Sequence, residues 1–272
     1  MKNIYLICMV AVAINMLTSC EDILDKSPLD LRTEETVWSD PKLAQAYLNR
    51  IWYMTGRNDY GNETWFSLYA GPLTPGTDIT SDNCYSNWNR GAAASKDDSN
   101  WNENTDIGLF DNYIDIRRCN IAIDHLTAGC GFGEEIERDM LGQAYFMRAY
   151  MYYWMVLHHG GVPYLKVPQD KDKDDLYVKR NSTPECFQFM IEDLDHAISL
   201  LPAKIAGSSS DYGRIDQCFA KSWKAKTLLL KASPQFNPKR MYDNAYWKEA
   251  YVAAKEAYDF CVQNGIALTE NP

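Results

Sequence analysis

The sequence EEIERDMLGQAYFMRAYMYYWMVLHHGGVPYL, residues 134–165, carries the strongest structural signal in this chain. Between Met140 and Leu157 nearly every residue is apolar or aromatic, so a single apolar stripe cannot describe the segment. Acidic residues open it, and two histidines followed by Gly160 close it, as the helix dipole and a glycine C-cap favour. These features predict a helix that is buried around most of its circumference.

The length of this segment would also suit a transmembrane helix, because about 20 apolar residues cross a bilayer. Arg148 argues against a membrane span, since an arginine at the bilayer centre costs about 2.5–3.5 kcal/mol on insertion scales. The neighbouring tyrosines would bring hydroxyl groups to depths where they need partners. In a helical protein, adjacent helices can satisfy both the tyrosines and Arg148. We therefore predict a core helix rather than a membrane span.

After Gly160 we expect a turn into a short extended segment, because Pro163 disfavours helical backbone at Val162. A tyrosine-rich helix of the form GQAYFMRAYMYYWMV followed by HHGGVPYL resembles the hallmark of the SusD/RagB family, outer-membrane lipoproteins of Bacteroidetes that capture nutrients. The blocks RNSTPECFQFMIEDLDHAISLLP and AKSWKAKTLLLKASPQFNP also resemble this family. The resemblance extends from Cys20 to the C-terminus. It implies a mainly α-helical fold with tetratricopeptide-like antiparallel helix pairs, long irregular loops and little β structure.

The first twenty residues, MKNIYLICMVAVAINMLTSC, have one lysine, an apolar core and small residues before Cys20, which is the layout of a secretory signal. Leu17 to Cys20 resembles a lipobox, so we expect residues 1–19 to be removed and Cys20 to carry lipid, including palmitate. The alternative is an ordinary signal peptide with a chance cysteine. Several acyl chains together give stable membrane anchoring. Glu21 and Asp22 resemble a surface-export tag, so the expected location is the outer face of the outer membrane.

Apolar residues recur at helical intervals in five further segments, residues 41–54, 107–127, 183–201, 215–232 and 245–264. Thr183 is the expected N-cap of the third of these, with Pro184 as its first helical residue. Small and aromatic residues on the paired helices resemble tetratricopeptide repeats without their regular period. Residues 166–179, KVPQDKDKDDLYVK, are expected to form a solvated charged linker.

Composition limits the partners of the mature chain. Removing residues 1–19, whose only charged side chain is Lys2, takes the net charge from −10 to −11. Such an acidic chain is not expected to bind nucleic acid.

Because members of the resembled family are longer, residues 20–272 are expected to be an N-terminal helical region that is incomplete at its C-terminus. Part of the apolar surface between Met140 and Leu157 would then lack a cover.

Residues 55–106 lose helical periodicity and fill with Asn, Asp, Gly, Ser and Trp. Loops longer than about 15 residues are uncommon in compact domains unless they have a function. Sugar rings stack their C–H faces on exposed aromatics, and their hydroxyls need polar partners. The resemblance also implies an aromatic ligand platform in this part of the chain. The alternative is that these aromatic rings are structural and only hold the long loop against the helices. The predicted ligand-binding residues are Trp88, Trp101, Tyr85, Asp78, Asp82, Asn87, Asn89 and Arg90.

The cysteines of the mature chain beyond Cys20 have wide, irregular spacings: Cys84, Cys119, Cys130, Cys186, Cys218 and Cys261. No CxxC pair of the zinc-binding type occurs among them. Four of the six lie within predicted helices beside apolar residues, where a small apolar side chain is the commoner role. We therefore predict no disulfide framework, although export would permit one.

No GxSxG, phosphate-binding loop, HExxH or dinucleotide-binding pattern is present in the sequence. His158 and His159 are adjacent, so they point to different sides of a helix end and predict no metal site. A glycosidase needs two carboxyl groups about 5 to 10 Å apart across a cleft, and no sequence feature marks such a pair. We therefore predict a binding protein that is not an enzyme and has no cofactor.

The resemblance implies a surface lipoprotein that captures an oligosaccharide or polysaccharide and passes it to a SusC-like TonB-dependent transporter in the outer membrane. Two alternatives remain open from the sequence, a surface glycoside hydrolase and a helical scaffold lipoprotein without a small ligand. Family members take different glycans or even peptides, so the sequence does not name the ligand.

Overall fold

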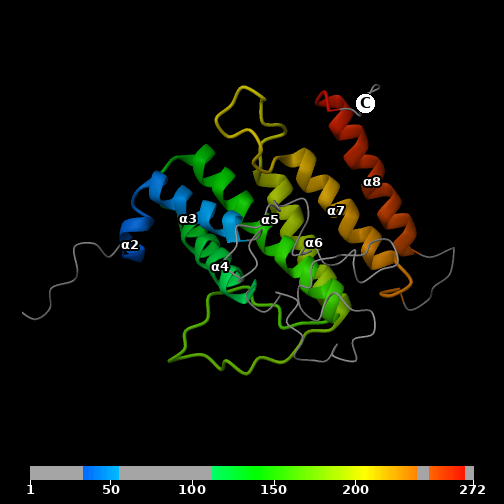
Figure 1. Cartoon of the computed structure of the whole chain (residues 1–272), viewed down its shortest axis with the longest axis horizontal. Helices are drawn as coiled ribbons and strands as arrows, with labels where there is room; N and C mark the ends of the chain where they lie inside the picture. Colours follow the sequence, from blue (N-terminus) through cyan, green and yellow to red (C-terminus); the bar gives the residue numbers. More distant parts are fainter. Residues whose placement is uncertain (1–32, 55–111, 238–244, 267–272) are drawn as a thin grey trace, which may run out of the picture.

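The computed structural model describes residues 33–54, 112–237 and 245–266 (Figure 1). Within these ranges the regular secondary structure is seven helices and no strand. They are α2 (Glu34–Val37), α3 (Pro41–Met54), α4 (Asn112–Ala128), α5 (Glu134–His159), α6 (Thr183–Leu200), α7 (Gln217–Ala232) and α8 (Ala245–Gln263). None of these helices is both long and apolar enough to span a membrane.

The helix α5 lies at the centre of the described structure, between α4 on one side and α6 on the other, with α3 also against it (Figure 1). Beyond α6 the stack continues through α7 to α8. Hydrogen bonds bring the start of α6 back to the end of α5, from Asn181 N–H to the Val162 carbonyl, and the start of α7 back to the end of α6, from Gln217 N–H to the Pro202 carbonyl. Consecutive helices therefore run antiparallel, which confirms the predicted architecture of antiparallel helix pairs.

Burial of α5 confirms the predicted core helix, since fifteen of its 26 residues are buried. The three remaining residues between Met140 and Leu157 are partly buried and pack against the core; they are Leu141, Tyr145 and Leu157. The expectation that this helix would lack part of its cover is therefore wrong. Helices α3, α4, α6 and α7 supply enough apolar surface to enclose it.

An exposed apolar stripe lies instead on α8. Its inner face packs on α7 through the buried Ala250 and Ala257. On the outer face large apolar side chains recur at intervals of four and seven residues, so they form one stripe along the helix. We call this stripe the α8 seam; its members are Trp247, Tyr251 (68% exposed), Tyr258 (66% exposed) and Val262. In Figure 1, α8 is the outermost helix at its end of the stack.

Two glycines end α5 for different reasons. Gly160 has φ 70°, a backbone conformation that favours glycine, and its N–H donates to the Val156 carbonyl to close the helix. A Cβ on Gly161 would lie only 2.1 Å from the backbone oxygen of Asn181. The pair therefore lets the chain leave the helix and pass directly against the segment that precedes α6.

The caps differ from the sequence expectations by one or two residues. Ser182, not Thr183, is the N-cap of α6, because its side chain accepts from Glu185 N–H while the Glu185 carboxylate accepts from Ser182 N–H. This capping box makes Thr183 the first helical residue. Helix α7 begins at Gln217 rather than Ile215, because the Asp216 side chain accepts from Phe219 N–H. The short helix α2, behind the Thr33 cap, was not predicted.

Candidate functional site

The described structure is built around a buried polar cluster that joins α5 to α6. Arg148 on α5 is 3% exposed and faces Asp193 on α6, which is 2% exposed. The arginine Nε donates to Oδ2 at 2.8 Å and its Nη2 to Oδ1 at 2.6 Å, the two-point geometry of a strong guanidinium–carboxylate pair. Burial alone lowers the pKa of Arg148, but hydrogen bonding to Asp193 leaves that pKa above its usual value. Both side chains are therefore desolvated, and the guanidinium keeps its proton.

The remaining guanidinium nitrogen of Arg148 extends this cluster to α4 and to the segment after α5. Nη1 donates to Asn120 Oδ1 at 2.8 Å and to the Lys166 carbonyl at 3.1 Å. The Asn120 amide in turn donates to the carbonyls of Leu165 and Val167 at 3.0 and 3.1 Å. The prediction that neighbouring helices satisfy Arg148 is confirmed, and the same contacts hold the backbone of residues 165–167.

Tyrosines hold the preceding part of this segment. The Tyr152 hydroxyl accepts from Leu165 N–H at 2.7 Å and donates to the Pro163 carbonyl at 3.3 Å. Its ring stacks on Tyr164 with centroids 3.7 Å apart, and the Tyr164 hydroxyl donates to Asp193 Oδ2 at 2.8 Å. Burial raises the pKa of both phenols above the usual value. Side chains thus supply the hydrogen bonds that a neighbouring strand would otherwise give this segment.

Residues 162–181 form a closed loop because the chain before α6 returns to the same place (Figure 1). Asn181 Oδ1 accepts from Tyr164 N–H at 2.9 Å. Arg180 donates to the carbonyls of Gly161 and His159, both at 2.6 Å. Within the loop, residues 171–180 are all exposed, which confirms most of the solvated linker predicted for residues 166–179, whereas residues 168–170 are partly buried. We call residues 162–181 the α5–α6 loop.

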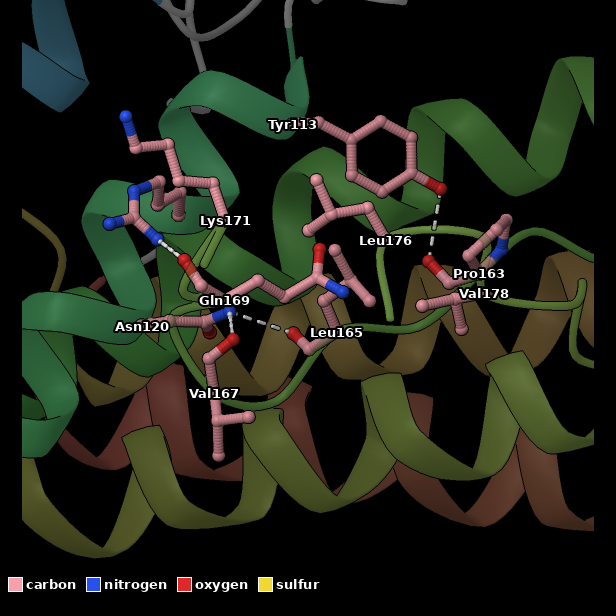
Figure 2. A pocket seen from close by; sticks show the side chains of 10 residues that line it. Tyr113, Asn120, Pro163, Leu165, Val167, Gln169, Lys171, Leu176 and Val178 are labelled. Atoms are coloured by element: carbon pink, nitrogen blue, oxygen red, sulfur yellow. Dashed lines mark hydrogen bonds between the residues drawn. The ribbon is translucent and has the colours of Figure 1, made fainter. Parts of the chain in front are cut away.

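A cavity of about 540 Å³ lies between this loop and α4 (Figure 2). Its wall is largely apolar, and three of its polar side chains reach across to the loop; Asn120, described above, is one of them. The Tyr113 hydroxyl donates to the Pro163 carbonyl at 2.9 Å, and Arg117 donates to the Gln169 carbonyl. The lining residues are Tyr113, Arg117, Asn120, Pro163, Leu165, Val167, Gln169, Lys171, Leu176 and Val178.

The described lining residues of this cavity carry positive charge. Its described residues include no carboxylate, so the cavity does not hold the two carboxyl groups that a glycosidase requires. Its charged side chains are the cations Arg117 and Lys171. A ligand here would make apolar contacts with the wall and meet positive charge at the side of α4.

The end of α5 shows no metal chemistry among the residues the structure describes. Burial, with a smaller contribution from His159, lowers the pKa of His158. In the described ranges no group of three or more histidine, cysteine, aspartate or glutamate side chains is placed to hold a metal ion.

The predicted ligand-binding residues all lie between Asp78 and Trp101, outside the described ranges, as does the predicted lipidation site Cys20. The structure therefore leaves both as predictions. Sequence reasoning did not single out Asp193 or Asn120, although each interrupts the apolar face of its helix. That interruption is the signal by which they could have been found.

Comparison with known proteins gives a consistent result. The sequence model of a SusD-like family, described as starch-binding and associating with the outer membrane, matches residues 22–222. A SusD-like protein from Bacteroides ovatus is 24% identical over 269 residues, which cover 96% of this chain and 45% of the relative. A SusD-like protein from Formosa agariphila is 29% identical over 218 residues, 78% of this chain and 39% of the relative. The chain thus spans less than half the length of these curated relatives.

Solved structures share the fold. A SusD-like protein from Bacteroides fragilis superposes with a TM-score of 0.60 at 22% identity, covering 86% of this chain and 41% of that one. A SusD-like carbohydrate-binding protein from Bacteroides vulgatus gives a TM-score of 0.61 at 16% identity, with coverage of 85% and 47%. The family match spans well over half of the 272 residues, and it includes both α5 and the loop that Arg148 holds. The chain therefore belongs to the SusD-like family of proteins described as starch-binding and associating with the outer membrane.

Proposed function

We propose that this protein is a cell-surface lipoprotein that binds an oligosaccharide or polysaccharide and passes it to a SusC-like TonB-dependent outer-membrane transporter. The observation that carries the proposal is the match of residues 22–222 to a family described as starch-binding and associating with the outer membrane. In this proposal the protein binds glycan without catalysis, and lipid on Cys20 anchors it at the outer face of the membrane.

The described structure supports a binding role for the side of the molecule where α3 ends and α4 begins. Helix α3 ends at Met54 and α4 begins at Asn112, and both pack on α5, so the segment between them starts and ends on one rigid core. Binding residues on loops held by a rigid scaffold are a common arrangement. The cavity wall begins at Tyr113, directly after the chain re-enters α4. We therefore assign glycan binding to the predicted residues between Asp78 and Trp101.

Substitution of the two predicted platform rings tests this assignment. Trp88→Ala and Trp101→Ala should each weaken retention in affinity gels containing starch or a related polysaccharide. Stacking of a sugar ring on tryptophan resembles stacking of a nucleic-acid base on an aromatic side chain, so each substitution should cost about 1–3 kcal/mol of binding free energy. The melting temperature should change little. The matched control is Tyr212→Ala, because Tyr212 is 70% exposed between α6 and α7, neither it nor its chain neighbours line the cavity, and its loss should leave binding unchanged. Normal binding by both tryptophan variants would refute the platform.

The same gels separate the alternatives. Release of reducing ends from the polysaccharide would mean a glycoside hydrolase, and no retention across a broad polysaccharide panel would mean a scaffold without a small ligand. Delivery to a transporter is tested by co-purification of the tagged protein with a TonB-dependent barrel from outer-membrane extracts. Absence of such a barrel would remove the transport step while leaving glycan binding in place.

Anchoring has an independent test. Labelled palmitate should enter the wild-type protein and be absent from Cys20→Ala, and antibody should stain intact cells that make the wild type. Cys130→Ala is the matched control and should keep the label. Label retained in the Cys20 variant would refute the lipidation site.

A further inference from the structure

Two cysteines face each other at one end of the α7–α8 pair. Cys218 is the second residue of α7, and Cys261 lies in the last turn of α8. Because the two helices run antiparallel, both cysteines occupy the same end. The Cys261 Sγ lies 3.8 Å from the Cys218 carbonyl oxygen and 3.9 Å from the Ser222 Oγ, one turn along α7. The Cys218 thiol itself donates to the Ala203 carbonyl at 3.3 Å, and Cys261 is close enough to act electrostatically on it.

We propose that Cys218 and Cys261 are a disulfide site that links α8 covalently to α7 when the protein meets a disulfide oxidant. The inference goes beyond glycan binding and does not depend on it. Exported proteins pass through oxidising compartments in which such bonds form and persist.

The other described cysteines have different surroundings. Cys119 is fully buried, and Arg148 and Asp115 are among the charged groups that act on it. The Cys130 thiol donates to the His125 carbonyl, and the Cys186 thiol donates to the Val162 carbonyl. Within the described ranges, a printed contact between one cysteine and another is therefore that of the Cys261 thiol with Cys218.

The difference in solvent exposure between the two cysteines sets the order of the two thiol–disulfide exchange steps. Cys261 is partly exposed and Cys218 is buried, so the Cys261 thiolate attacks the external disulfide first and releases one thiolate from it. The Cys218 thiolate then attacks the Cys261 sulfur and releases the second. Two protein thiols become one disulfide, the external disulfide becomes two thiols, and their protons are conserved. Burial and then the Cys261 charge raise the pKa of Cys218 to about 12, and the second contribution ends once Cys261 is in the mixed disulfide.

The cross-link would strengthen the end of the helix pair that has less apolar packing. The small cluster of Leu228, Ala232 and Ala250 lies at the opposite end. At the cysteine end, the contacts include the exposed Lys204 amine on the carbonyls of Asn264 and Gly265 at 2.9 and 3.3 Å, and Lys221 over the Phe260 ring at 4.9 Å. Surface contacts of this kind contribute little to stability. A covalent link there would hold α8, and with it the α8 seam, in place.

The test uses the purified mature chain treated with oxidised glutathione, then denatured and blocked with a maleimide. The wild type should lose two thiols and the mass of two hydrogen atoms, with one peptide joining Cys218 to Cys261 in a non-reducing digest. Cys218→Ala should give a glutathione adduct on Cys261 instead, and Cys261→Ser should give neither product. Cys130→Ala is the control and should form the cross-link as the wild type does.

Stability gives a second readout that needs no variant. Reducing the oxidised wild type should lower its melting temperature by about 5–15 °C, as expected for opening a loop of this length in a domain of this size. Circular dichroism of each variant shows whether it is folded, and Cys261→Ser is the milder change because that side chain is partly exposed. The proposal is overturned if the folded wild type keeps both thiols, or if the cross-link persists in Cys261→Ser.

Discussion

Replacing Arg148 by methionine tests whether the buried ion pair holds α4, α5, α6 and the α5–α6 loop together. The substitution keeps a long side chain but removes four hydrogen bonds, two to Asp193 and one each to Asn120 and the Lys166 carbonyl. Asp193 would then be a carboxylate in the core with the Tyr164 hydroxyl as its remaining donor from this cluster. Removing one partner of a buried pair costs about 3–5 kcal/mol. For a domain of this size the melting temperature should fall by about 6–20 °C.

A double-mutant cycle separates the pair from its surroundings. Asp193→Leu alone strands the Arg148 charge, whereas Arg148→Met combined with Asp193→Leu removes both charges and leaves apolar side chains. The double variant should therefore cost less than the sum of the single variants, with a coupling energy of about 2–3 kcal/mol. It should not reach wild-type stability, because Asn120 and Tyr164 lose partners worth about 1–3 kcal/mol each.

Urea unfolding followed by circular dichroism measures each free energy, with one m-value fitted to the set. The matched control is the exposed pair of Lys166 and Glu192, 2.9 Å apart, which also joins the α5–α6 loop to α6. The same cycle on that pair should give a coupling energy below about 1 kcal/mol. Additive free energies at Arg148 and Asp193, or single variants within about 1 kcal/mol of wild type, would refute the reasoning.

Three further predictions use the same unfolding assay or a dye. Gly161→Ala should lower the unfolding free energy by about 1–3 kcal/mol, because the added Cβ would lie 2.1 Å from the backbone oxygen of Asn181. The control Gly207→Ala has room for a Cβ and should change the unfolding free energy little. Equal effects of the two substitutions would contradict the close approach at Gly161. Burial raises the pKa of Tyr150 to about 12, so the stabilising contribution of this phenol is complete below pH 10 and is lost as the pH rises from 10 toward 12. Tyr150→Phe should therefore flatten the decline of the unfolding free energy over this pH range. An unchanged slope of unfolding free energy against pH would count against this assignment. Tyr251→Ser with Tyr258→Ser should reduce hydrophobic-dye binding and self-association through the α8 seam, and unchanged fluorescence would place the dye elsewhere.

Local sequence patterns predicted the helices well, with errors concentrated at their ends. Periodicity reports which face of a helix is apolar, but the first helical residue depends on which side chain reaches the free N–H groups. At α6 both Ser182 and Thr183 could cap, and the choice of Ser182 depends on the backbone angles that permit the return contact from Glu185. The location of uncovered apolar surface was also missed, because it depends on how many neighbours each helix has.

Of the candidate site, the sequence predicted that Arg148 must have partners but did not name them. Asp193 lies 45 residues away and Asn120 lies 28 residues away on a different helix. Their meeting requires the rotation of each helix about its axis and the offset between antiparallel neighbours. No local pattern encodes those quantities, since they follow from the packing of many side chains at once.

The sequence by itself determined the helical class, the burial of residues 140–157 and the extended turn after Gly160. These follow from short-range physics, namely side-chain periodicity, the helix dipole and the restriction that Pro163 places on its neighbour. Only the tertiary structure decided that Arg148 pairs with Asp193, that the α5–α6 loop closes over a cavity, and that Cys218 lies beside Cys261. These contacts join residues far apart in the chain, and only the packing of whole helices brings them within reach of one another.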